Sequence, residues 1–189
     1  MEKLITNKEK SRKVLITGTG RCGSTFLMVL LTYLELDTGF TVSNFKEFIG
    51  IGNNRRQGLE KYDYIWEKPY ILKNPQYFGD FEKILKYVII DYVIIPLRNY
   101  KDAADSRVKN GLLWRASNET EQIKWYYELV AEYVLMMAKN DIPTIFLDFE
   151  RMISSKEYLF DKLSPILKDI SFEKFEYAYD EATKHQRNL

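Results

Sequence analysis

The strongest constraint on the fold lies in residues 14–34, where a short apolar run leads through a glycine-rich loop into a second apolar segment. The run VLI at 14–16 predicts a buried strand. Leucines recur at helical spacing over residues 27–34, so a helix is expected to begin at about Ser24. Free backbone N–H groups and the positive end of the helix dipole meet in such a loop. We therefore expect an anion site in residues 18–25, called here the glycine loop.

Two nucleotide-binding motifs overlap in the glycine loop. Gly18, Gly20 and Gly23 match G-x-G-x-x-G, which predicts a dinucleotide site when an acidic residue ends the next strand. The nearest candidate for this acidic residue, Asp37, precedes the next expected strand instead. The loop also fits the P-loop frame G-x-x-x-x-G-K-[ST], except that Ser24 stands at the lysine position. An NAD-binding protein and a P-loop nucleotide kinase or hydrolase are thus two alternative interpretations.

The composition excludes several classes of function. Lysine and arginine together number 28 and aspartate and glutamate 27, so no overall field attracts nucleic acid. No signal peptide is evident, and no apolar run is long and uncharged enough to span a membrane. Cys22, the only cysteine, excludes an internal disulfide and a multi-cysteine metal site. These observations predict a cytoplasmic protein with no nucleic-acid partner, and they leave the oligomeric state open.

Strands and helices alternate along the chain, which predicts an α/β fold. We expect one three-layer domain over residues 1–189, with a polar segment at 1–12 and a helix and tail at 168–189. Its central sheet should be mostly parallel, because helical segments separate the strands. About five strands are expected, at residues 14–16, 40–42, 70–72, 92–96 and 144–147.

Three later helices carry recognisable signals, and a fourth is expected to start near residue 101. Asn118 and Glu121 resemble a capping box at the start of a helix over residues 119–139. Ser154 and Glu157 predict the cap of the next helix, and residues 172–183 predict the last one. The helix over 119–139 is expected to bury one apolar face, made of Ile123, Tyr127, Val130, Val134 and Met137.

Polar residues cluster where the expected strands end. Arg21, Ser24 and Thr25 follow the first strand, Lys73 follows the third, and Arg98 follows the fourth with Ser106 eight residues later. In a parallel sheet these positions converge on one crevice. A guanidinium fork and a hydroxyl suit a phosphate, so we expect Arg98 and Ser106 to face one ligand group.

These segments resemble the sulfotransferases that use 3′-phosphoadenosine 5′-phosphosulfate (PAPS). The family's phosphosulfate loop has a basic residue, a small residue and then Gly-Thr-Thr or a close variant, as at positions 21–25 here (Arg21, Cys22, Gly23, Ser24, Thr25). Its second signature is a strand-end arginine with a serine eight residues on, matched by Arg98 and Ser106. Lys73-Asn74-Pro75 is similar to the lysine-x-proline element of the glycan and tyrosyl-protein branches of the family. The chain resembles these branches and the bacterial branch more closely than the cytosolic branch.

The resemblance implies in-line transfer of a sulfuryl group from PAPS to a hydroxyl or amine acceptor, leaving adenosine 3′,5′-bisphosphate (PAP). Arg21 and Lys73 would be the catalytic cations, Arg98 and Ser106 would bind the 3′-phosphate, and no metal would be required. The 5′-phosphate would lie against the loop residues Gly20, Arg21, Cys22, Gly23, Ser24 and Thr25. A carbohydrate, phenol or small metabolite is the expected acceptor, and a non-catalytic nucleotide-binding protein of the same fold is a further alternative.

The general base and the adenine-stacking residue are less well defined by the sequence. Glu47 is the first choice for the base because it follows the expected second strand, and Glu67 is the alternative. His185, the only histidine, is expected at the surface or in the tail. Three tryptophans could stack on adenine, namely Trp66, Trp114 and Trp125.

Overall fold

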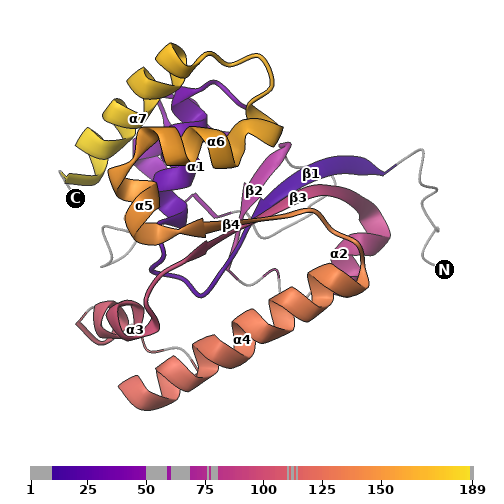
Figure 1. Cartoon of the computed structure of the whole chain (residues 1–189), viewed down its shortest axis with the longest axis vertical. Coiled ribbons are helices and arrows are strands. Elements are labelled where there is room, and N and C mark those ends of the chain that lie inside the picture. The colour runs from indigo at the N-terminus through magenta and orange to yellow at the C-terminus, as the bar shows by residue number, and fades with distance from the viewer. Residues whose placement is uncertain are drawn as a thin grey trace.

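A four-stranded parallel sheet forms the centre of the molecule (Figure 1). The computed structural model describes residues 10–49, 59–60, 69–75, 77, 81–109, 111, 113 and 115–187. Within them the strand order is β2-β1-β3-β4, and each neighbouring pair runs parallel. The strands are β1 (Ser11–Ile16), β2 (Ile71–Lys73), β3 (Val88–Leu97) and β4 (Thr144–Asp148).

Helices cover both faces of the sheet. On one face α1, α5, α6 and α7 share a core with β1, and on the other α2 and α4 share a second core (Figure 1). This arrangement agrees with the expected three-layer α/β architecture. The helical elements are α1 (Ser24–Tyr33), the short 3₁₀ helix η1 (Phe45–Phe48), α2 (Phe81–Tyr87), α3 (Tyr100–Lys109), α4 (Glu119–Lys139), α5 (Phe149–Ser154), α6 (Lys156–Leu167) and α7 (Phe172–Arg187). None of the described helices has an apolar stretch long enough to cross a bilayer.

Strand β1 fixes the position of the glycine loop because it is buried on both faces. Val14 and Ile16 pack into the core with α1, whereas Leu15 packs into the core with α4. Successive side chains of a strand point to opposite faces, so the apolar run VLI serves both layers. Val14 lies opposite Ile71 of β2 and Tyr92 of β3. The loop that follows β1 therefore emerges in the middle of the sheet, between its neighbours' carboxyl ends.

The strand predicted at residues 40–42 is absent, and the sheet has four strands, not five. The chain turns there instead, because Thr41 N donates to Asn44 Oδ1 at 2.8 Å and Asn44 N donates to Thr41 O at 3.1 Å. Asparagine and threonine side chains that bond to nearby backbone compete with a strand ladder. The other four strands are confirmed, the one predicted at 70–72 being shifted by one residue.

Helix α4 has the predicted bounds, and Asn118 caps it by accepting a hydrogen bond from Glu121 N at 3.0 Å. The reciprocal half of the capping box differs, because Glu121 Oε2 accepts from Ser117 N. The predicted apolar face is displaced by one residue at four of its five positions, and only Met137 belongs to the buried face as predicted. Tyr127 and Val134 are 64% and 45% exposed, and the buried face is Gln122, Tyr126, Leu129, Tyr133 and Met137.

Hydroxyl groups explain the rotation of α4. Tyr133 donates to Pro75 O at 3.3 Å and pairs with the Thr17 hydroxyl at 2.7 Å, and Tyr126 accepts from the Arg107 guanidinium at 2.6 Å. Each tyrosine thus buries its ring and satisfies its polar tip beneath the strand ends. Among the described residues, Tyr127 and Val134 make no such hydrogen bond. Hydrophobic periodicity alone does not distinguish the predicted face of α4 from the buried one.

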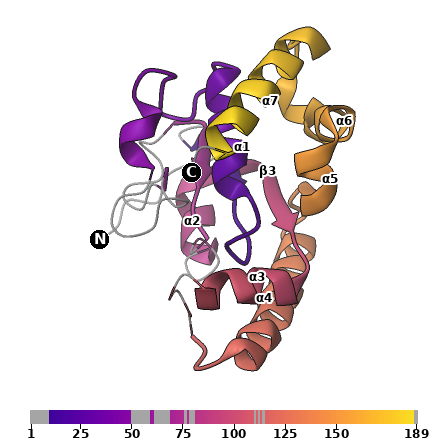
Figure 2. The same cartoon turned by 90° about the vertical axis from the view of Figure 1, so that its left-hand side faces the viewer.

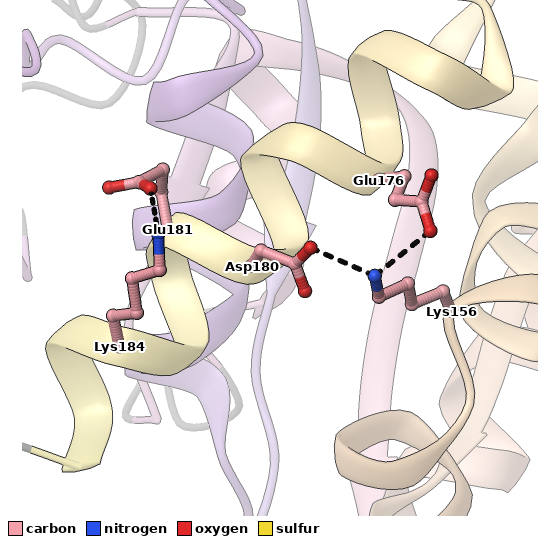
Figure 3. A network of polar contacts seen from close by, with 5 residues as sticks. All are labelled: Lys156, Glu176, Asp180, Glu181 and Lys184. Carbon is pink, nitrogen blue, oxygen red and sulfur yellow. Dashed lines mark hydrogen bonds and ion pairs between the residues drawn. The ribbon is translucent and has the colours of Figure 1, made fainter.

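The predicted cap of α6 is also displaced by one residue. Ser155 caps the helix by accepting from Tyr158 N at 3.1 Å, whereas Ser154 donates to Glu150 O at 2.6 Å and closes α5. Figure 3 shows how the start of α6 is tied to α7, the predicted last helix, which extends to Arg187. Lys156 Nζ lies 3.0 Å from Glu176 Oε1 and 2.9 Å from Asp180 Oδ2, and Lys184 pairs with Glu181 one turn on.

Candidate anion-binding site

The backbone of the glycine loop adopts an open, amide-lined form. Gly20 and Gly23 have φ angles of 74° and 83°, and Arg21 between them has a φ of 59°. Backbone N–H groups in turn conformations can converge on a concavity that binds an anion. Gly23 is the N-cap of α1, where it contributes no side-chain cap, and the first turn holds no acidic residue. The amino end of α1 therefore has neither a side-chain cap nor an acidic first turn, which is the condition in which a helix N-terminus can bind an anion.

A buried arginine supports the loop from below. Arg107 Nη2 donates to Thr19 O at 3.0 Å, and its Nε donates to the Tyr126 hydroxyl. A Cβ at Gly20 would collide with this guanidinium, so the position needs glycine for space as well as for its φ. Arg107 was not predicted from the sequence. Its spacing from the buried Ala103 and Ala104 places it on the inner face of α3, which is the signal that could have found it.

Arg21, Arg98 and Ser106 meet at one point of the loop. Arg21 Nε donates to Ser106 Oγ at 3.1 Å, and Arg98 Nη1 donates to Arg21 O at 3.2 Å. Arg98 also lies over the Phe149 ring, with its Cζ 4.6 Å from the ring centroid. Its Nε atom is buried and has no hydrogen-bond partner among the described residues. Two residues predicted to bind one phosphate are thus brought to the same side of the loop.

Lys73 reaches the other side of the loop from the end of β2. Its Nζ donates to Thr25 Oγ1 at 2.8 Å and lies 2.8 Å from Glu60 Oε1. The side chain is only 2% exposed. Burial lowers the pKa of the Lys73 ammonium, and the Glu60 carboxylate opposes part of that shift. Thr25 and Lys73, two residues that the sequence assigns to one site, are therefore in direct contact.

The carboxylate beside this lysine is Glu60, not Glu47. Glu47 is exposed on η1, whose Phe45 ring lies 5.6 Å from Tyr33 at the last residue of α1. A ten-residue helix is about 15 Å long, so η1 stands at the end of α1 opposite the glycine loop (Figure 2). Glu60 follows the buried Leu59 and carries no motif, so no sequence pattern identified it.

Other predicted residues fall outside the cluster. Cys22 is in the loop but buried, and burial raises the pKa of its thiol, so it is a packing residue and not a reactive thiolate. His185 is partly buried against Phe45, with ring centroids 5.0 Å apart, and does not lie free at the surface as predicted. Trp125 is partly buried on α4, with its ring 5.6 Å from that of Tyr126. Glu67, Trp66 and Trp114 lie outside the described residues.

The assembled cluster is suited to two anionic groups. One lies within reach of Arg98, Arg21 and Ser106, and the other lies over the loop amides and Lys73. Within the part of the chain that the structure describes, no three His, Cys, Asp or Glu side chains gather as a metal site would require. No protein-family model and no curated protein matches the chain. The chemistry of the site therefore rests on its own geometry.

Proposed function

We propose that the chain is a PAPS-dependent sulfotransferase, which transfers a sulfuryl group to a hydroxyl acceptor. The observation that carries this proposal is the contact of Arg98 with Arg21 and of Arg21 with Ser106 on one side of a loop whose other side holds Lys73. Two separate cationic positions flank one amide-lined loop, as a donor with a 3′-phosphate and a 5′-phosphosulfate requires. The unpartnered Nε of Arg98 supplies a donor for the 3′-phosphate.

The other residues take roles that follow from where they lie. The loop amides and the hydroxyls of Ser24 and Thr25 hold the 5′-phosphate at the amino end of α1. Lys73 faces the charge that spreads over the sulfuryl oxygens and the leaving phosphate oxygen. The Arg21 guanidinium, which contacts Ser106 in the structure, is expected to turn toward the same charge when the donor binds. Preformed cations at these places lower the barrier because they need no reorganisation during the reaction.

Glu60 is the proposed general base. Its Oε1 atom is 2.8 Å from Lys73 Nζ, so a hydroxyl brought up to the sulfuryl group at Lys73 lies within reach of this carboxylate. In this proposal Glu60 replaces Glu47, which the sequence suggested and which the fold places at the far end of α1.

A P-loop nucleotide kinase or hydrolase is the alternative enzyme, and a non-catalytic nucleotide-binding protein shares the same site. The kinase alternative lacks the loop lysine that reaches the β- and γ-phosphates, because Ser24 stands there. Both alternatives are outcomes of the ligand test below.

Thermal unfolding with PAP, ATP and NADH in parallel tests the donor class. At 100 times its dissociation constant, a ligand adds about 2.7 kcal/mol to the unfolding free energy. For a chain of this size we expect PAP to raise Tm by about 5 to 10 °C, and ATP and NADH to have much smaller effects. Arg98→Ala should lose most of the PAP shift, because it removes the guanidinium whose buried Nε has no hydrogen-bond partner among the described residues.

Arg151→Ala is the matched control for Arg98→Ala. Arg151 also lies over an aromatic ring, with its Cζ 4.0 Å from the Tyr158 centroid, but it is exposed on α5. The control should keep the full PAP shift. A normal PAP shift in Arg98→Ala would refute the 3′-phosphate assignment, and a shift with ATP or NADH alone would refute the sulfotransferase proposal. PAP binding without transfer of labelled sulfate to any sugar or phenol would indicate the non-catalytic protein.

A further inference from the structure

The ammonium group of Lys73 occupies the place that a divalent cation takes in P-loop enzymes. In those enzymes the final Ser or Thr of the loop motif and a carboxylate from a neighbouring segment hold Mg²⁺. Thr25 stands at that motif position here, and Glu60 supplies a carboxylate. Lys73 Nζ lies 2.8 Å from Thr25 Oγ1 and 2.8 Å from Glu60 Oε1.

We infer that Lys73 is a built-in substitute for this metal and that it makes the glycine loop select metal-free donors over Mg²⁺-bound nucleoside triphosphates. The nature of the donor rests on the proposed function, whereas the occupation of a cation site by Lys73 does not. Lys73 thus acts as a specificity residue in addition to its catalytic role.

Charge and space both support the inference that Lys73 takes the place of a metal ion. The Lys73 side chain is 2% exposed, so it fills the volume between the hydroxyl and the carboxylate. Mg²⁺ requires near-octahedral oxygen ligation at about 2.0–2.1 Å and keeps several waters, for which this position has no room while the lysine is present. A second cation at the same oxygens would also meet strong repulsion from the ammonium.

The charge of the transferred group matches a single ammonium. The outer sulfuryl group of a phosphosulfate carries one negative charge, whereas the terminal phosphoryl group of ATP carries about two at neutral pH. The single positive charge on Lys73, which it shares with Glu60, suits the former without a metal. Mg²⁺·ATP brings its own cation to the place that Lys73 fills, and is disfavoured for that reason.

Removal of the lysine should open the site to a metal. We use Mn²⁺ as the probe, detected by the loss of its free signal in electron paramagnetic resonance, with no nucleotide present. Wild type should bind Mn²⁺ only weakly. Lys73→Ala frees the Thr25 and Glu60 oxygens, and Lys73→Asp adds a carboxylate ligand, so each should bind one Mn²⁺ per chain at least tenfold more tightly than wild type.

Three controls isolate the site. Lys73→Met removes the charge but keeps most of the volume, and should bind no more Mn²⁺ than wild type. Lys13→Met removes another buried lysine, on β1, and should also behave as wild type. Lys73→Ala combined with Glu60→Gln replaces the carboxylate ligand by a neutral amide, and should lose at least tenfold in Mn²⁺ affinity relative to Lys73→Ala.

Lys73→Ala and Lys73→Asp are both measured, so that the test still stands if one of them does not fold. Thermal unfolding verifies that each variant is folded. Folded Lys73→Ala or Lys73→Asp that binds Mn²⁺ no better than wild type would overturn the inference. Equal Mn²⁺ binding by Lys13→Met would overturn it as well, since the gain would then come from elsewhere. The outcome is independent of PAP binding, so failure here is distinguishable from failure of the sulfotransferase proposal.

Discussion

Replacing Glu60 by glutamine is expected to lower kcat for sulfuryl transfer by about 10²- to 10⁴-fold, the usual contribution of a general base. Glutamine has the size of glutamate and still accepts a hydrogen bond from Lys73, but it does not take up the acceptor proton. The affinity for PAP should change little, because the base acts on the acceptor. The measurement is the steady-state rate of labelled sulfate transfer to the best acceptor found with wild type, together with PAP titration.

The parallel variant Glu47→Gln decides between the two carboxylates. Glu47 is exposed on η1 at the far end of α1, so its substitution should leave kcat within about twofold of wild type. A large loss in Glu47→Gln with normal turnover in Glu60→Gln would reverse the assignment. Loss of PAP binding in Glu60→Gln would instead show that the carboxylate holds the loop and is not the base.

Replacing Lys73 by methionine is expected to lower kcat by about 10²- to 10³-fold, as when one preorganised donor is removed from a charged transition state. Methionine fills the buried volume, so unfolding of the variant should not account for the loss. Lys73→Arg keeps the charge and should retain more activity than Lys73→Met. Activity equal to wild type in Lys73→Met would exclude the lysine from the chemistry.

The same lysine predicts a pH dependence. Burial lowers the pKa of Lys73, so its proton is lost at a lower pH than from an ordinary lysine. Because the ammonium form is the active one, kcat/KM should fall on the alkaline side as pH rises through this lowered pKa. Arginine keeps its proton to much higher pH, so Lys73→Arg should move the alkaline fall upward. If kcat/KM of Lys73→Arg falls at the same alkaline pH as in wild type, the titration responsible for the fall belongs to another group.

Much of the fold was predictable because apolar runs of the right length determine it. The run VLI at 14–16 and the apolar run of β3 are buried in the sheet, as their composition predicted. Residues 40–42 look similar locally, but Thr41 and Asn44 satisfy the backbone in a turn. The buried face of α4 was mispredicted because the predicted face is the more apolar of the two by sequence, whereas the buried face is held by the hydroxyls of Tyr126 and Tyr133, which bond across the fold.

The site was predictable where residues lie close in sequence to a motif or at a strand end. Arg21, Thr25, Lys73, Arg98 and Ser106 are such residues, and the structure brings them together, although their binding roles remain predictions. Glu60 was missed because nothing in its local sequence marks it, and only the three-dimensional path of the chain carries it to Lys73. Arg107 was missed because a buried arginine on a helix is an exception to the usual burial pattern.

The left-handed backbone conformation of Arg21 lowers the stability of the protein at a position where the side chain is proposed to serve activity. A non-glycine residue at a φ of 59° costs about 1 kcal/mol or more, and this cost is carried by the resting protein. Glycine would remove the strain, yet it would also remove the guanidinium that contacts Ser106. A directed-evolution campaign that rewarded heat resistance alone would therefore favour glycine at residue 21, and would enrich well-folded proteins that have lost the cation proposed for catalysis.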